Sequence, residues 1–328
     1  MLTVHELERP PAAFLAAAVE GADFYGAYQD AGIPEFRFGY LEVRRAGVAV
    51  SVLPYFLTHF ALNTMLGDGA LKSALGWLKL PVLCVGHPAM DVGAIDGEIS
   101  AEVLAAANRI LGRKSALLAY KGFGESLPLP GFVRTRGLPN AILDVPQDYF
   151  ARLRSERRNN FQRKLKKAAA LRIEEHDGLP EHLVGHVFEL YLNTLQKASL
   201  SFERLTEDYF RNTAAISKYL LAFEGTQLIG FTQLMGKQGK MVFKYVGMDY
   251  ERGRQYGLYF VLLLKAVDIC VRDAYTEMDL GATAYNFKQL LGARLEETCV
   301  HFRHRNPLAH WLLGKFRFLL EPSAEDLR

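Results

Sequence analysis

The sequence is poor in cysteine and has no long apolar run. Its three cysteines are Cys84, Cys270 and Cys299. This odd count without a CxxC pair argues against a disulfide framework or a zinc ribbon and favours a reducing, cytoplasmic compartment. The longest apolar stretch, Leu258–Val271, is interrupted by Lys265 and Asp268, so it falls short of the ~18–20 residues that a membrane span needs. The first residues lack a basic region, so we expect no signal peptide.

Several catalytic motifs are missing as well. The sequence has no Walker A loop, no HExxH helix and no Gly-x-Ser-x-Gly elbow, and the last absence argues against a serine hydrolase. His182 and His186 share one face of a predicted helix, but no third ligand lies near them in the sequence. We therefore predict no metal site.

What the chain does contain is enough for two domains. It has 328 residues, of which 50% are hydrophobic and 23% are charged, as is ordinary for a globular protein. A strand–turn–strand pattern in 36–58 returns in 219–235, and a helix–strand pattern in 99–120 returns in 258–281. This repeated order predicts two α/β domains in tandem, over residues 1–145 and 146–328.

The stretch Lys240–Ala293 is the most informative part of the sequence. It predicts a strand over 240–248, a polar loop over 249–257, a long helix from Leu258, and a short strand over 276–281. A glycine-bearing turn that opens a helix presents unpaired N–H groups and the positive end of the helix dipole. Such a turn suits a diphosphate, although an ordinary connection with solvated arginines fits the spacing equally well.

The corresponding stretch of the first half has the opposite charge. Met90–Ser100 carries Asp91, Asp96 and Glu98 but no lysine or arginine. Acids at a helix start suit the helix dipole but repel a diphosphate. We therefore expect a donor site in the second domain alone, with the first domain as a degenerate copy.

These residues resemble a known superfamily. Arg254-Gln-Tyr-Gly257-Leu-Tyr259 resembles the Arg/Gln-x-x-Gly-x-Gly/Ala pyrophosphate loop of the GNAT N-acyltransferases, with Tyr259 where Gly or Ala is usual. Phe287-Lys-Gln-Leu-Leu-Gly292-Ala293 resembles the FK…G segment of the FemAB-like and BioF2-like branch, and 154–167 resembles the basic helix that opens its second domain. The resemblance implies an α/β fold of two tandem GNAT-like domains, each with a mixed sheet flanked by helices.

The resemblance also implies a donor and its contacts. Acyl-CoA would be the co-substrate, with its diphosphate at the head of the helix that begins at Leu258. The residues predicted to bind it are Tyr245, Val246, Arg252, Gly253, Arg254, Gln255, Tyr256 and Gly257.

Three residues are the main candidates for catalysis, and Tyr245 is a weaker fourth. Lys288 stands four residues before Gly292, where GNAT enzymes carry a proton-donating tyrosine; it would stabilise an oxyanion or a donor phosphate, or be a plain surface lysine. Tyr285 is an alternative proton donor, and Tyr245 is a weaker one that also fits a core position. Asp279 ends a short strand and is either a base for the acceptor amine or a structural acid of the next turn.

The acceptor is predicted from the same resemblance. The loop 197–203 would line its site, which makes Lys197, Phe202 and Glu203 candidates for acceptor binding, with an ordinary inter-helix loop as the alternative. The acceptor would be a small-molecule or peptide amine bound between the domains.

Two segments could contact larger partners. Arg152–Lys167 holds eight basic residues and one acid, whereas the whole chain has a net charge of +3. We expect one helix over 149–170 with Leu153, Phe161 and Leu165 as its apolar stripe; solvated charge is the default, and tRNA or anionic lipid is the alternative. No interleaved aromatic platform supports sequence-specific reading of nucleic acid, and we expect no DNA partner. The final segment, Arg303–Leu320, is expected to pack as a helix rather than contact a membrane.

The sequence thus predicts an N-acyltransferase with an acyl-CoA donor. An aminoacyl-tRNA donor is the second interpretation, favoured by Lys288 and the basic segment; the acceptor would then be a peptidoglycan precursor or a small molecule. The lack of a heptad run, and so of a coiled-coil insertion, weakens the peptidoglycan case. A catalytically inactive binding module for cell-wall or lipid precursors is the interpretation from another class.

Overall fold

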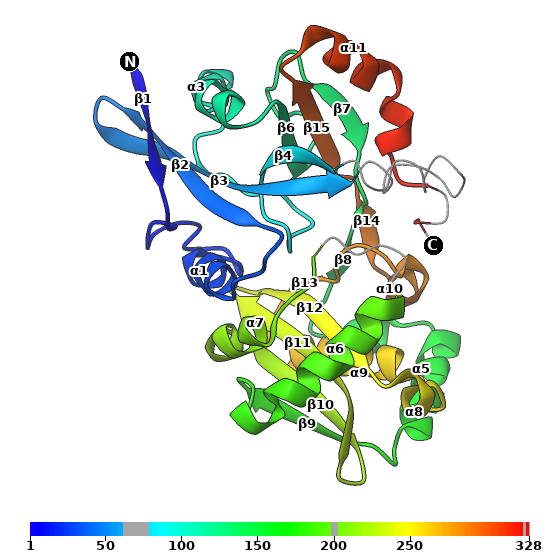
Figure 1. Ribbon diagram of the computed structural model, residues 1–328. Helices are drawn as coiled ribbons and strands as arrows, with labels where there is room; N and C mark the ends of the chain where they lie inside the picture. Colours follow the sequence, from blue (N-terminus) through cyan, green and yellow to red (C-terminus); the bar gives the residue numbers. More distant parts are fainter. Residues whose placement is uncertain (62–78, 198–202, 324–325, 328) are drawn as a thin grey trace. The chain divides into compact units, whose positions relative to one another are not determined.

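The computed structural model describes residues 1–61, 79–197, 203–323 and 326–327. The chain divides into two compact units: Met1–Leu15, Pro34–Asn140 and Glu296–Arg328 form the first, and Ala16–Ile33 and Ala141–Leu295 form the second. Each unit is built on one mixed sheet with helices packed against it (Figure 1), which confirms the predicted fold class. No described helix is both long and apolar enough to cross a membrane.

The first unit has the sheet order β1-β2-β3-β4-β6-β15-β7, with β5 beside β3. The strands are β1 (Leu2–Leu7), β2 (Arg37–Arg45), β3 (Val48–Ala61), β4 (Lys79–Val85), β5 (Asp96–Gly97), β6 (Leu117–Phe123), β7 (Val133–Arg136) and β15 (Cys299–His304). Helix α3 (Ala101–Lys114) connects β4 to β6 and buries Val103, Leu104, Ala107 and Leu111, which recur at helical spacing. Helix α11 (Pro307–Lys315) and the 3₁₀ helix η4 (Arg317–Leu320) follow β15.

The second unit has the sheet order β14-β8-β13-β12-β11-β10-β9. The strands are β8 (Asn140–Asp144), β9 (Arg172–Asp177), β10 (Lys218–Glu224), β11 (Gln227–Lys237), β12 (Lys240–Met248), β13 (Glu277–Asp279) and β14 (Arg294–Glu296). The helices are α1 (Ala22–Asp30), α4 (Tyr149–Arg152), α5 (Ser155–Lys167), η2 (Glu181–Leu183), α6 (Val184–Lys197), α7 (Glu207–Asn212), η3 (Ala214–Ile216), α8 (Tyr250–Arg254), α9 (Leu258–Arg272) and α10 (Tyr285–Leu291).

The two sheets share one topology. In the first unit α3 connects the parallel strands β4 and β6, and β15 runs antiparallel beside β6. In the second unit α9 connects the parallel strands β12 and β13, and β8 runs antiparallel beside β13. This matches the repeated order of elements that the sequence predicts.

The predicted domain boundary at residue 145 needs correction. Strand β8 precedes it but pairs in the second sheet, and β15 lies far beyond it but pairs in the first. Residues 16–33, with α1, also belong to the second unit. Local patterns of hydrophobicity predict strands but not their pairing partners, so this exchange of segments left no signal in the sequence.

The basic segment also differs from the single helix expected over 149–170. It forms α4 and α5, separated at Leu153 and Arg154, whose backbones are extended. Phe161 is buried, and Leu153 and Leu165 pack against the same core, so the predicted apolar stripe is confirmed. The break lets Leu153 reach the core without continuing the helix.

The sheet of the second unit opens beside β12. Its parallel pairing with β13 ends at Val242 and Asp279, so Phe243–Met248 continue without β13 as a neighbour. On the other side the register with β11 shifts and skips Lys244, which is therefore a bulge residue. Helix α9 lies on the Gly230 face of this sheet, and α6 lies on the Gly247 face (Figure 1).

The bulge carries a buried ion pair. The Lys244 ammonium binds the Glu20 carboxylate, and the side chains are only 5% and 12% exposed. The Lys244 Nζ atom also lies 4.8 Å from the centre of the Phe24 ring in α1. These contacts fasten the segment 16–33 to β12, so this pair helps to hold the segment in the second unit.

We expect Glu20→Ala to lower the free energy of unfolding by about 3 kcal/mol, because it leaves a buried ammonium without its carboxylate. The double variant Glu20→Leu with Lys244→Met should lower the free energy of unfolding by less than the sum of the losses caused by Glu20→Leu alone and Lys244→Met alone. Denaturant titration of Glu20→Ala, of the two single variants and of the double variant measures these free energies. The control is Asp148→Ala, which removes the exposed pair with Arg152 and should change little. Equal effects of Glu20→Ala and Asp148→Ala would contradict the assignment.

Candidate donor-binding site

The connection between β12 and α9 contains a helix. Residues Tyr250–Arg254 form α8, whose N-cap Asp249 accepts hydrogen bonds from the amides of Glu251 and Arg252 at 2.9 and 3.0 Å. The open polar loop expected over 249–257 is therefore corrected. An aspartate before a polar run is a regular helix start, and this signal was present in the sequence.

The two glycines of the connection have different roles. Gly257 has a left-handed backbone with φ of 62° immediately before α9, a conformation that favours glycine. Gly253 packs closely, since a Cβ atom there would lie 3.2 Å from the side chain of Leu258. The first amides of a helix have no carbonyl partners within that helix. The amides of Leu258 and Tyr259 therefore belong to the positive end of α9.

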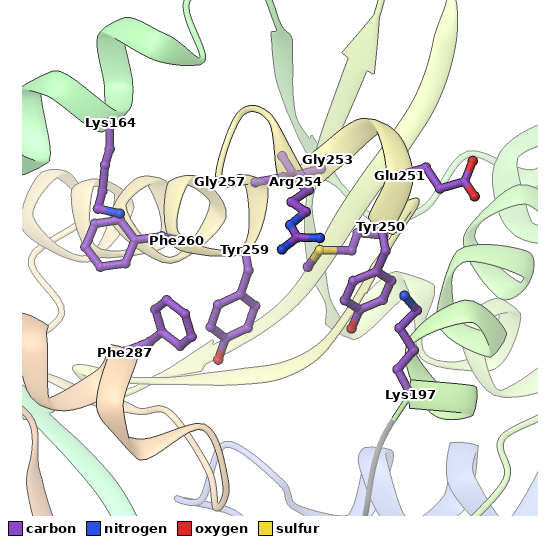
Figure 2. A pocket seen from close by; sticks show the side chains of 12 residues that line it. Lys164, Lys197, Tyr250, Glu251, Gly253, Arg254, Gly257, Tyr259, Phe260 and Phe287 are labelled. Carbon is purple, nitrogen blue, oxygen red and sulfur yellow. The ribbon is translucent and has the colours of Figure 1, made fainter. Parts of the chain in front are cut away.

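A cavity of about 570 Å³ lies at this helix start. It is lined by Lys164, Lys197, Met248, Tyr250, Glu251, Gly253, Arg254, Gly257, Leu258, Tyr259, Phe260 and Phe287. Figure 2 shows Tyr250, Arg254 and Tyr259 converging on one space from α8 and the head of α9. Its volume is in the range of small-molecule sites.

The charge of this cavity is positive. Arg254, Lys164 and Lys197 line it, against one carboxylate, that of Glu251. The Nζ atom of Lys164 lies 4.6 Å from the ring centre of Phe260, and that of Lys197 lies 4.5 Å from the ring centre of Tyr250. Cation–π contacts of this kind hold the ammonium groups against the walls of the cavity.

The walls of the cavity are aromatic. The rings of Tyr259 and Phe287 meet edge to face with centroids 5.5 Å apart, and Tyr250 and Phe260 add two more rings. Burial raises the pKa of Tyr259, so its hydroxyl stays protonated at neutral pH. Tyr259 and Phe287 belong to the two motifs that carry the resemblance, but neither was predicted to line the site.

Three of the predicted donor-binding residues face elsewhere. The Glu224 carboxylate, at the end of β10, accepts hydrogen bonds from Arg252 at 3.1 Å, Gln255 at 3.4 Å and Tyr256 at 2.7 Å. These three side chains do not line the cavity. Of the two arginines, therefore, Arg254 lines the cavity and Arg252 fastens α8 to β10. Sequence spacing could not separate them, because their directions depend on α8.

The three predicted catalytic residues flank one loop, residues 280–284, with Asp279 at the end of β13 and Tyr285 and Lys288 in α10. Lys288 is 3% exposed, and its ammonium donates to the carbonyls of Gly281 and Ala282 at 3.0 and 2.7 Å. Asp279 accepts a hydrogen bond from the Gly281 amide at 2.7 Å. Tyr285 is buried, with its ring centre 5.9 Å from the Lys288 Nζ atom. Lys288 is therefore not the exposed lysine of the alternative interpretation.

This loop has an unusual backbone. Thr283 and Ala284 have φ angles of 65° and 47°, a region that a β-branched residue rarely occupies. Such strain persists only where surrounding contacts enforce it, and it is frequent at functional sites. Lys288 and Asp279 supply those contacts from the two sides of the loop.

The remaining candidates lie at β12 and at the end of α6. The Tyr245 hydroxyl donates to the Glu203 carboxylate at 2.6 Å; burial, and then the charge of Glu203, raise the pKa of Tyr245 well above its usual value. Val246 follows in the part of β12 beyond its pairing with β13. Lys197, predicted for the acceptor, lines the cavity at the head of α9. Phe202 lies outside the described residues.

At the N-terminal end of α3 in the first unit, the hydrogen-bonding groups of Glu98 and Ser100 already have partners among side chains of the same unit. Glu98 accepts hydrogen bonds from Arg45 at 2.6 and 3.0 Å and from Ser100 at 2.8 Å, and the Ser100 hydroxyl caps α3 at the Val103 amide. Hydrogen bonds from Arg45 and Ser100 lower the pKa of Glu98 to about 2, so it is ionised at neutral pH. This helix start thus has its own anion. Across the described ranges, no group of three or more His, Cys, Asp or Glu residues is placed to hold a metal ion.

Comparison with known proteins identifies the fold. Residues 155–289 match the acetyltransferase (GNAT) domain family. FemX is similar over 88% of this chain and 98% of its own, with 11% identity and a TM-score of 0.54. The chain has the fold of FemX, and its residues 155–289 belong to the GNAT domain family. The predicted resemblance is therefore confirmed.

Two further structures have the same fold. A tandem GNAT protein from the clavulanic acid biosynthesis pathway covers 93% of this chain and 99% of its own, with 14% identity and a TM-score of 0.50. The C-terminal domain of a protein assigned as a lysylphosphatidylglycerol synthetase from Agrobacterium fabrum covers 81% and 85%, with 12% identity and a TM-score of 0.54. No curated protein matches the sequence of this chain.

We expect Glu224→Ala to loosen the α8–α9 connection, because three side chains lose a shared acceptor. The expected cost is about 1 kcal/mol of stability, with faster amide hydrogen exchange in 250–257. Exchange measured by mass spectrometry and thermal unfolding test this. Glu251→Ala, an exposed acid on the same helix, serves as the control and should leave exchange unchanged. Unchanged exchange in Glu224→Ala would contradict the role of Glu224.

Proposed function

We propose that this protein is an N-acyltransferase whose donor is a CoA thioester bound at the head of α9. The observation that supports this is the cavity itself, which Arg254, Lys164 and Lys197 line together with the first residues of α9, a helix whose N-cap Gly257 provides no side-chain hydrogen bond. Three cations against one carboxylate, together with a helix dipole, favour a ligand with several negative charges.

The residues present fit the parts of CoA. The amides of Leu258 and Tyr259, with Arg254, would hold the diphosphate. The rings of Tyr250, Tyr259, Phe260 and Phe287 offer apolar and stacking surface for the adenine. The opening of the sheet beyond Val242 leaves the backbone of Tyr245 and Val246 without β13 as a neighbour, and an extended amide arm would pair with it.

Acyl transfer needs two proton movements besides the attack on the carbonyl. The acceptor nitrogen forms a bond to the acyl carbon and loses a proton, the C–S bond breaks, and the thiolate takes a proton. Asp279 and Lys288 hold the loop beside the opening of the sheet, so they are positioning residues in this proposal. Tyr245 lies on β12 beyond its pairing with β13. Its hydroxyl proton, which is donated to Glu203 in this structure, would be transferred to the departing thiolate.

A second donor, aminoacyl-tRNA, is supported by two observations. Tyr259 stands where the pyrophosphate loop usually has a small residue, so its ring would leave less room for a diphosphate. The same ring lines the cavity and would offer a face on which a terminal base stacks. Lys164 of the basic helix α5 lines the same cavity, so the backbone of a larger nucleic acid would meet further cations on α5.

We expect Arg254→Ala to weaken CoA binding by about tenfold to a hundredfold, because a charge-assisted contact to phosphate is lost. Arg252→Ala is the matched control: the residue is two positions away but bonds Glu224, so affinity should change by less than about twofold. Isothermal titration with CoA and acetyl-CoA measures both.

Three outcomes would change the donor assignment. Equal loss in both variants would contradict the distinct roles of the two arginines. Absence of CoA binding by the unmodified protein would overturn the CoA proposal, and binding of aminoacyl-tRNA in its place would establish the second donor. Tight CoA binding without any transfer to amines would favour an inactive binding module.

For Lys288→Met we expect turnover to fall by about tenfold or more while CoA affinity stays within about twofold, because Lys288 braces the loop but does not line the cavity. Thiol release from acetyl-CoA with a panel of primary amines gives turnover, and titration gives affinity. Lys237→Met, at the exposed end of β11, is the control. A parallel loss of affinity and turnover would show that Lys288 acts on donor binding instead.

A further inference from the structure

The end of the chain carries an exposed apolar surface. Neither α11 nor η4 has a buried residue. Six large apolar side chains between residues 308 and 319 are 39–67% exposed: Leu308, Trp311, Leu312, Phe316, Phe318 and Leu319. Single exposed apolar residues are normal, but six within twelve residues form a patch of the kind that marks an interaction site.

Only one side of α11 packs on the first unit. Leu308, Trp311 and Leu312 recur at the spacing of one helix face and point outward, whereas Leu313 and Gly314 are partly buried. A Cβ atom on Gly314 would lie 3.6 Å from Val133 of β7, an ordinary packing distance, so this side of α11 faces β7. Of the segment Arg303–Leu320, expected to pack as a final helix, the first two residues end β15 and α11 packs against β7, but its large apolar side chains are exposed.

The segment that carries the patch is rich in positive charge, and the nearest described carboxylate along the chain, that of Glu321, is paired with Arg136. Arg303, Arg305, Lys315 and Arg317 are all exposed, and residues 301–320 contain no Asp or Glu. The Lys315 Nζ atom lies 5.7 Å from the ring centre of Trp311, so a cation stands beside the largest apolar side chain. This segment contributes four positive charges to a chain whose net charge is +3.

We propose that α11 and η4 form a docking surface for an anionic lipid membrane. A short helix with Trp, Phe and Leu on its outer face and Lys and Arg around them lies in the plane of a membrane interface, with apolar side chains among the acyl chains and cations among the phosphates. Charge also argues against a second copy of the chain, because a two-fold contact through this patch would bring the same four cations together. This docking surface is independent of the donor site.

The test uses the full chain with vesicles of phosphatidylcholine and vesicles of equimolar phosphatidylcholine and phosphatidylglycerol. We expect co-sedimentation with the anionic vesicles only, weakening as salt is added. Lys315→Glu with Arg317→Glu should lower binding by about tenfold or more, and Trp311→Ser with Phe316→Ser should lower it by a similar factor. The matched controls are Arg113→Glu on α3 and Val48→Ser at the start of β3, both exposed in the same unit, and both should bind as the unmodified protein does.

Fluorescence gives a second, direct measurement. The chain has two tryptophans, Trp77 and Trp311, so Trp77→Phe leaves Trp311 as the only reporter. Its emission should shift to the blue when anionic vesicles are added. The proposal is overturned if the protein binds no anionic vesicles at low salt, or if both patch variants bind like their controls. A Trp311 emission that is already blue-shifted and unchanged by vesicles would show that another part of the chain, or a second copy, covers the patch.

Discussion

The second unit is organised around the N-terminal end of α9, which carries the positive end of the helix dipole and has no side-chain cap. Most helices in proteins cap this end with their own acids or hydroxyls, as α3 does with Ser100 and Glu98. Helix α9 begins instead at a left-handed glycine that offers no side chain, and Arg254 adds a further positive charge beside it. An arrangement that collects cations at a positive dipole end is costly unless an anion binds there. The contrast between α3 and α9 therefore explains why one copy of a repeated fold would bind a nucleotide and the other would not.

The rest of the second unit holds this helix start in place. Glu224 fastens α8 through three donors, and Leu258 packs on Gly253, so the turn before α9 is rigid. Ten of the fifteen residues of α9 are buried and fix the helix in the core, which makes its first turn a stable platform. The opening between β12 and β13 then leads from this platform toward the loop that Lys288 and Asp279 brace.

Much of this arrangement could be predicted from the sequence, and the failures have definite causes. The strand–helix–strand order and the apolar stripe of the basic segment follow from local periodicity, which reports which face is buried. The exchange of β8 and β15 between the halves could not be predicted, because strand pairing is set by contacts far apart in the sequence. The sequence offered no means of separating the roles of Arg252 and Arg254. Their side chains point in different directions because both residues lie in the helix α8. For Lys288 the sequence left a surface lysine open as the alternative to a catalytic one, because its partners are backbone carbonyls, which no side-chain pattern reveals.

Hydrogen exchange with and without CoA tests the central claim most directly, since it compares the two helix starts within one molecule. Our account predicts that bound CoA slows amide exchange at 254–260, at the head of α9, and leaves exchange at 98–104, at the head of α3, unchanged. Protection at 98–104, or CoA binding without protection at 254–260, would contradict it.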